Sequence, residues 1–290
     1  MKEQKQKSEK GLAKAKKSAL NALDLNRNGK IDIEDIIVSG MRLPGIRIDR
    51  ERFLRKQLEA HYPKEIVDKA IAESPMRALI PQEMINKLAD DVIRFERTCV
   101  SGISAAISMP GGVAMVATIP ADIAQYYGYL LRAAQKLLYL YGFPEIDTSE
   151  SAGQFDDATM NTMILCFGVM YGTAGASNAL KAVAKALGNG VEKQLLKKAL
   201  TKGTIYPIVK NVAKWFGVKM TKKVFAEFFK KAIPVAGGII GGTITYFTFK
   251  PCCDKLKDVL EDTALSNPNH IPPYQHKEKF EVHDIDWINK

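Results

Sequence analysis

The sequence predicts an all-α fold, a multi-helix bundle with two Gly-rich apolar helical segments and an N-terminal helix-loop-helix. Hydrophobic residues make up 46% of the 290 residues, which is enough for a sizeable core. The segments between prolines follow the spacing of amphipathic helices, and no run of alternating β-branched residues indicates a sheet. We expect an N-terminal module at residues 1–48, a helical domain at 49–263 and a flexible tail at 264–290.

The N-terminal module begins with a basic helix and continues into the loop DLNRNGKIDIED, residues 24–35. An EF-hand loop places oxygen ligands at positions 1, 3, 5, 7, 9 and 12 and a glycine at position 6. Here Gly29 is that glycine, and Ile31 at position 8 is expected to pack inward. The ligand positions hold Asp24, Asn26, Asn28, Lys30, Asp32 and Asp35, of which Lys30 offers only its backbone carbonyl. The loop therefore predicts a calcium site.

Two features of the loop predict weak calcium binding with competition from magnesium. Asp35 stands at the last ligand position, where a longer glutamate normally binds the ion through both oxygens. Only three of the ligand side chains are carboxylates. A second candidate loop beginning at Asp147 has alanine at the glycine position and at the last ligand position. We therefore expect a solitary hand, or one that pairs between chains.

The helical domain begins with short charged helices joined by turns at Pro63, Pro75 and Pro81. Two uncharged runs follow, at residues 98–121 and 232–249, and both contain a proline and paired glycines. Each run approaches the ~20 residues that cross a bilayer. The breaks favour buried core helices over membrane spans, and hairpin insertion into a membrane is the alternative.

A polar stripe on the next predicted helix is a second candidate site. It comprises Asp122, Gln125, Tyr126, Tyr129, Arg132 and Lys136, which fall within an arc of about 120° on a helix. We favour a solvent-facing stripe or an ion pair of Asp122 with Arg132 or Lys136 over a ligand pocket with aromatic walls. The sequence contains no GxSxG, HExxH, P-loop or Rossmann glycine motif, so no catalytic set emerges.

The positive charge is concentrated in residues 181–231, which contain thirteen lysines, two glutamates and no arginine. Lysine alone gives a diffuse positive surface, which is typical of contact with anionic lipid headgroups or of a solvated helix face. Arginine is the usual reader of base edges, so we expect no specific nucleic acid. The predicted partner is an anionic membrane surface or another protein. Scattered cysteines and the lack of a secretory signal favour a cytoplasmic protein, peripheral at the inner membrane.

The segments IPADIAQYYGYLLRAAQKLLYLYGFPE and KKAIPVAGGIIGGTITYFTFKPCCDKL resemble the EcsC family of bacterial proteins, over residues 85–262. The resemblance implies an intracellular helical protein close to the membrane, with no established biochemical activity. It singles out Asp122, Arg132 and the glycines at positions 237, 238, 241 and 242. The calcium loop is not part of the pattern of that family.

Three functional hypotheses follow. The leading one is a noncatalytic, calcium-binding helical protein that associates peripherally with membrane. The second is an enzyme that acts on a lipid or another amphiphile in a pocket near Asp122 and Arg132. The third is a soluble scaffold or polyanion-binding protein, for which a flat lysine surface far from any apolar patch would be expected.

Overall fold

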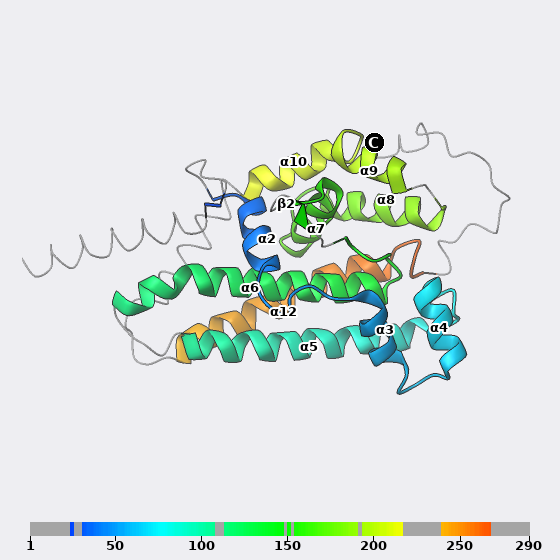
Figure 1. Cartoon of the computed structure of the whole chain (residues 1–290), viewed down its shortest axis with the longest axis horizontal. Coiled ribbons are helices and arrows are strands. Elements are labelled where there is room, and N and C mark those ends of the chain that lie inside the picture. Colours follow the sequence, from blue (N-terminus) through cyan, green and yellow to red (C-terminus); the bar gives the residue numbers. More distant parts are fainter. Residues whose placement is uncertain are drawn as a thin grey trace, which may run out of the picture. The chain divides into compact units, whose positions relative to one another are not determined.

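The computed structural model describes residues 24–25, 31–107, 113–147, 150–151, 154–190, 193–216 and 239–267. Within them the fold is all-α, which confirms the predicted class (Figure 1). The helices are α2 (Ile33–Met41), α3 (Arg50–Leu58), α4 (Lys64–Ala72), α5 (Gln82–Ile107), α6 (Val113–Leu140), α7 (Asp157–Met170), α8 (Ala176–Gly188), α9 (Lys193–Thr201), α10 (Tyr206–Trp215) and α12 (Ile239–Glu261). Two short strands, β1 (Glu150–Ser151) and β2 (Gln154–Phe155), pair antiparallel.

Aspartate side chains begin three of these helices. Asp32, Asp49 and Asp156 each accept a hydrogen bond from a backbone N–H of the first turn of α2, α3 and α7. Such a bond satisfies a donor that the helix itself leaves unpaired. After α6 the chain turns at Gly142, whose φ of 89° is a left-handed conformation that glycine adopts without steric penalty.

Both predicted apolar runs become ends of long helices. α5 continues from its charged first half through Arg97 to Ile107, and α6 starts at Val113. The predicted break at Pro110 therefore falls between two helices, in residues outside the described ones. The second run supplies the first half of α12, which continues past Pro251 into a charged second half.

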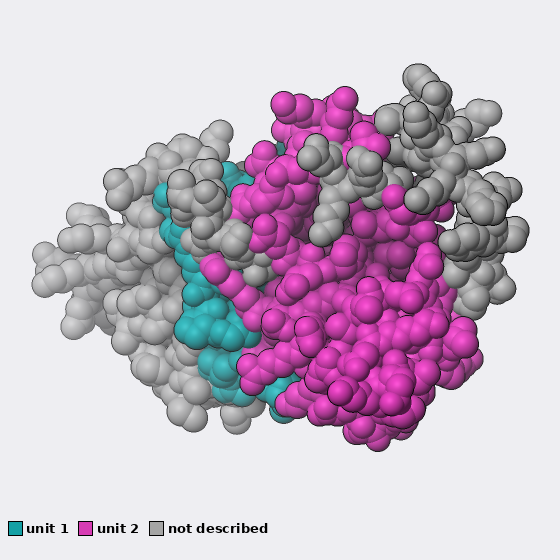
Figure 2. All heavy atoms as spheres, turned by 45° about the vertical axis from the view of Figure 1, so that its right-hand side comes forward, with its two compact units in different colours: residues 1–46, 95–131, 213–250 teal, residues 47–94, 132–212, 251–290 magenta. Residues whose placement is uncertain are grey.

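Contacts divide the chain into two compact units, which are coloured separately in Figure 2. Unit 1 comprises residues 1–46, 95–131 and 213–250, and unit 2 comprises residues 47–94, 132–212 and 251–290. Each unit contains its own part of α5, α6 and α12.

In unit 1, α2 crosses α6 where two glycines meet. A Cβ atom added to Gly40 would lie 3.0 Å from the backbone of Gly128, which is closer than real Cβ atoms normally approach. Glycine at both positions therefore lets the two backbones come together. The apolar face of α2, with Ile33, Ile37 and Met41 almost fully buried, lies in the core of this unit.

In unit 2, α7 is the central helix and packs against α8 and α9. Gly168 of α7 also allows close contact with Val212 of α10, because an added Cβ atom would lie 2.9 Å from that side chain. α3 packs against α4. The side chain of Arg50 at the start of α3 is buried and donates to two backbone carbonyls, at 3.0 Å to Phe143 and at 2.6 Å to Ile71.

The units do not coincide with the domains expected from the sequence. The expected N-terminal module would end at residue 48, yet its helix α2 belongs to the same unit as residues 95–131 of α5 and α6. The physical reason is the apolar face of α2. A helix of nine residues that is buried along one side needs a partner to cover it, and α6 supplies that partner at Gly128.

Candidate functional site

The predicted calcium loop leads directly into α2. Three of its six predicted ligands, Asp24, Asp32 and Asp35, are described, whereas Asn26, Asn28 and Lys30 lie outside the described residues. Asp32 is the residue before the first turn of α2, and Asp35 is the third residue of the helix. The ninth and twelfth loop positions therefore lie on one helical turn.

These two aspartates hold each other in place. The backbone N–H of Asp35 donates to Oδ1 of Asp32 at 3.1 Å, and the backbone N–H of Asp32 donates to Oδ2 of Asp35 at 3.2 Å. This reciprocal arrangement is a capping box, which satisfies two N–H groups at the start of the helix. The loop pattern predicts both residues as ligands and does not predict that they also cap α2. The signal for this second role was present, because an acidic residue three positions after an N-cap aspartate is the pattern of such a box.

Asp35 also closes the loop. Its Oδ1 atom accepts a hydrogen bond of 3.1 Å from the backbone N–H of Leu25, the second residue of the loop. Asp35 is only 3% exposed, whereas Leu25 is 40% exposed. The part-buried bond joins the first and last parts of the loop. Each carboxylate oxygen has further acceptor capacity. Asp35 can therefore hold the loop closed and still offer oxygen to a cation.

The loop is attached to the core of unit 1 on the side that the sequence predicts. Ile31 is 7% exposed, which confirms the expectation that this residue packs inward. One turn later Ile33 and Ile37 are buried, and Gly40 meets Gly128 of α6. The loop thus leads directly into a helix that is packed in the core of the unit.

Glu34 lies directly before Asp35 in α2. Burial raises the pKa of Glu34 to about 7, and the negative charges of Asp32 and Asp35 add to this shift. Glu34 stands at the eleventh loop position, which is not a ligand position. Three acidic side chains lie at the start of α2, that of Asp32 at the N-cap and those of Glu34 and Asp35 in the first turn.

The donor set fits a hard cation, although the described residues do not complete a site. Among the described part of the chain, no group of three or more Asp, Glu, His or Cys side chains is placed to hold a metal ion. Half of the predicted ligands lie at positions 26, 28 and 30, outside that part. Carboxylate, amide and backbone oxygens are what calcium and magnesium prefer. The chemistry of the residues therefore agrees with a calcium loop.

The polar stripe on α6 is partly buried, which contradicts one of its two favoured interpretations. Gln125, Tyr126 and Lys136 are at most 8% exposed, so the solvent-facing stripe is wrong for these residues. The reason is that α6 is covered on more than one side. In unit 1 the hydroxyl of Tyr126 donates to Thr248 of α12 at 3.3 Å, and in unit 2 the ammonium group of Lys136 lies over the ring of Phe53.

The remaining stripe residues are Asp122, Tyr129 and Arg132. Tyr129 and Arg132 are half-buried, and the side chain of Asp122 lies outside what the structure describes. The expected pairing of Asp122 with Arg132 or Lys136 therefore stays a prediction. Gly237 and Gly238 lie outside the described residues as well, whereas positions 241 and 242 lie in α12.

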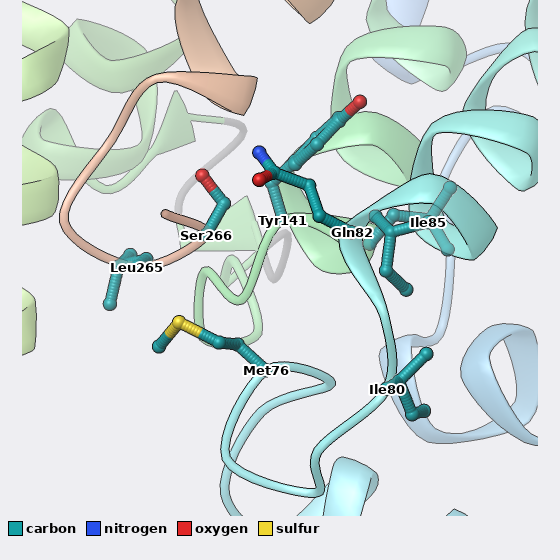
Figure 3. Close-up of a pocket in the computed structure, with 8 residues that line it drawn as sticks. Met76, Ile80, Gln82, Ile85, Tyr141, Leu265 and Ser266 are labelled. Atoms are coloured by element: carbon teal, nitrogen blue, oxygen red, sulfur yellow. The ribbon is translucent and has the colours of Figure 1, made fainter. Parts of the chain in front are cut away.

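A small cavity lies in unit 2 and contains none of the stripe residues (Figure 3). Its volume is about 10 Å³, which is room for about one water molecule. Pockets for small organic ligands are roughly 300–1,000 Å³. This cavity is therefore too small to hold a lipid or another amphiphile. Its lining residues are Met76, Ile80, Gln82, Ile85, Leu140, Tyr141, Leu265 and Ser266.

The described part of the lysine-only stretch forms α8, α9 and α10. Lys185, Lys198, Lys202 and Lys210 are exposed there. Two other lysines of this stretch are paired with acids, Lys181 with Asp262 at 2.5 Å and Lys197 with Asp156. Leu195 on α9 is 40% exposed and lies on the same side of the helix as Lys198 and Lys202 by helical spacing. The surface of α9 thus combines positive charge with an apolar side chain.

Comparison with known proteins gives no match. No protein-family model, no curated protein and no solved structure is significantly similar to the chain. The resemblance to the EcsC family stays a prediction from the sequence. Among the described helices, none combines the length and the apolar character needed to cross a membrane.

Proposed function

We propose that the chain is a noncatalytic calcium-binding protein whose single hand, residues 24–35, is part of a helical unit. The observation that carries the proposal is the position of Asp35. It ends the loop, caps α2 and bonds to the backbone of Leu25 at 3.1 Å. The first and last parts of the loop are therefore already close together before an ion binds, which lowers the entropic cost of binding.

The affinity is expected to be modest and the ion selectivity low. Three carboxylates supply most of the negative charge, and an aspartate at the last position favours a single oxygen contact over two. Sensor-type hands bind calcium with Kd of roughly 10⁻⁷–10⁻⁵ M, and we expect this hand to be at or above the weak end of that range. Magnesium at cellular concentration would then compete.

Calorimetric titration with calcium and with magnesium tests this proposal. Ion binding to the wild-type chain should release or absorb heat, with a stoichiometry of one ion per chain. Asp24→Ala should abolish this heat signal because it removes the first ligand. Asp147→Ala is the matched control, since Asp147 begins the second candidate loop, which lacks the glycine and the last acid. No calcium heat in the wild type, or equal loss in both variants, would refute the calcium site.

Peripheral association with an anionic membrane is a second proposed function. It is supported by the exposed lysines of α9 and α10 and by the exposed side chain of Leu195 beside them. Lysine near an anionic surface contributes about 1 kcal/mol per residue, and long lysine side chains can cover apolar surface while their charge stays in water. A location at the cytoplasmic face of the inner membrane agrees with the resemblance to the EcsC family.

Flotation with vesicles of phosphatidylglycerol and phosphatidylcholine measures this association. The double variant Lys198→Gln/Lys202→Gln should bind about 30-fold more weakly, because two charges of about 1 kcal/mol each are lost. The control is Lys64→Gln/Lys69→Gln, which removes two exposed lysines from α4 of the same unit. Equal weakening by both pairs would show that net charge, and not this surface, drives binding.

A further inference from the structure

One end of unit 1 is built from three helical segments that contain no charged residue. They are residues 98–107 of α5, residues 113–121 of α6 and residues 239–249 of α12. We call them together the charge-free tip. Charged residues flank the tip on each helix, at Arg97, Asp122 and Lys250.

The three segments lie together at the same end of the unit (Figure 1). The buried hydroxyls of Ser104 on α5 and Thr245 on α12 are hydrogen-bonded at 3.3 Å. α5 and α6 follow each other in the chain with five residues between Ile107 and Val113. α6 is joined to α12 by the bond between Tyr126 and Thr248. These bonds join α5 to α12 within the tip, and α6 to α12 next to it.

The length of the tip matches one leaflet of a bilayer. Its segments have nine to eleven residues, which at ~1.5 Å per residue gives about 14–16 Å. The hydrocarbon core of a bilayer is about 30 Å thick, so half of it is about 15 Å. In helices the backbone polar groups are already hydrogen-bonded, as a lipid environment requires.

The described side chains of the tip include buried hydroxyl groups and exposed apolar groups. Two hydroxyl side chains of the tip, those of Ser104 and Thr245, are fully buried, whereas Thr248 is exposed. Among the large apolar side chains described in the tip, Val100 and Phe249 are buried and others are exposed. Ile103 is 38% exposed and Phe247 is 69% exposed. Helices that pack through small and hydroxyl side chains and expose apolar ones are typical of a lipid environment.

Basic and aromatic residues lie at the base of the tip on α5 and α12, and Asp122 flanks it on α6. The guanidinium group of Arg97 lies 4.0 Å from the ring centroid of Tyr246, and Lys250 is exposed one turn further along α12. Tyr246 and Phe247 are both exposed at this level. Aromatic rings with long basic side chains mark the depth of the headgroups in membrane proteins.

We propose that the charge-free tip inserts into one leaflet of an anionic membrane, with Arg97, Tyr246 and Lys250 at the level of the headgroups. The inference rests on the proposed membrane association and goes beyond it, because contact through the lysines of α9 and α10 alone requires no insertion. Ile103 lies six residues beyond Arg97, which places it about 9 Å deeper than the headgroup level.

The depth of one added tryptophan per variant tests the insertion. Ile103→Trp, Phe247→Trp and Leu79→Trp are made in the full chain, and each is compared with the wild-type signal of Trp215 and Trp287. Vesicles contain phosphatidylglycerol and phosphatidylcholine, with bromine either near the headgroup or near the end of the acyl chain. We expect deep bromine to quench position 103, shallow bromine to quench position 247, and neither to quench position 79. Leu79 is the control, because it is 83% exposed and belongs to unit 2.

The outcomes separate insertion from surface association. Binding without quenching at positions 103 and 247 would overturn insertion and leave the lysine surface in place. No binding of the wild type at low salt would overturn both. A dimer in solution that Ile103→Glu converts to a monomer, with no quenching on vesicles, would assign the tip to a second copy of the chain and overturn insertion.

A charge in the tip provides an independent measure. Ile103→Glu should lower vesicle binding about 30-fold or more, because a charged side chain disfavours insertion even at moderate depth. Leu79→Glu, the same change of charge at an exposed position outside the tip, should bind like the wild type. Far-UV circular dichroism of both variants should be unchanged, since both positions are exposed. Equal binding by the two variants would contradict insertion.

Discussion

Replacing Arg50 with methionine is expected to destabilise unit 2 by about 3–5 kcal/mol. Arg50 is 8% exposed, and its guanidinium group donates from Nε to Phe143 and from Nη1 to Ile71. The second acceptor lies in the last turn of α4, where the helix leaves its own carbonyls unpaired. Methionine keeps most of the volume but leaves both buried carbonyls without these donors. Burial already lowers the pKa of Arg50, in agreement with a desolvated charge.

Chemical denaturation measures the loss of stability, and hydrogen exchange in α3 and α4 shows where it occurs. The matched control is Arg52→Met, because Arg52 lies on the same helix but is exposed. Surface substitutions of this kind usually change stability by less than about 0.5 kcal/mol. If the two variants are equally stable, Arg50 does not join these segments in solution.

Replacing Asp35 with alanine is expected to remove calcium binding and to destabilise unit 1 by about 2–3 kcal/mol even without calcium. The capping box contributes about 1 kcal/mol, and the N–H groups of Leu25 and Asp32 each lose an acceptor. Denaturation in the presence of a chelator isolates the structural part, and calorimetry gives the loss of the ion. A variant that keeps full calcium affinity would contradict the role of Asp35 as the last ligand.

Asparagine at the same position separates the two roles of Asp35. Asp35→Asn keeps one oxygen acceptor but removes the negative charge, so the apo protein should lose less stability than in the alanine variant. Calcium binding should still fall sharply, because one of three carboxylates is gone. Equal loss of stability in both variants would show that the charge itself, and not the hydrogen bonds, holds the start of α2.

Much of the fold follows from local sequence patterns. The spacing of apolar residues and the prolines between them predict α3, α4 and α5 well, whereas the predicted break at Pro110 lies outside the described residues. Such patterns do not show which charged residues are buried. Arg50, Arg52 and Arg55 occur in one charged segment, and only the contacts of the folded chain distinguish the first from the other two.

The candidate site could be predicted in part. The fixed spacing of Asp24, Asp32 and Asp35 is a property of the sequence, and so is the inward position of Ile31. The contact between Gly40 and Gly128 joins residues 88 positions apart, and no local sequence pattern predicts it. The same limit applies to the polar stripe of α6, because whether one side of a helix faces water depends on which other helices cover it.

The central claim is that calcium binds the loop at residues 24–35 and stabilises unit 1 through α2. Hydrogen exchange with and without calcium is the most direct measurement, applied to the wild type, Asp32→Ala and Asp49→Ala. Both variants lose a helix N-cap, but only Asp32 belongs to the loop.

At a hundredfold excess over Kd, the ion should add about 2.7 kcal/mol of stability. Calcium should therefore slow exchange in α2 and in residues 123–131 of α6, in the wild type and in Asp49→Ala. Calcium should not change hydrogen exchange in Asp32→Ala, and it should not change exchange in α7 of any of the three proteins. An absence of calcium protection in wild-type α2, or equal protection in Asp32→Ala, would contradict the claim.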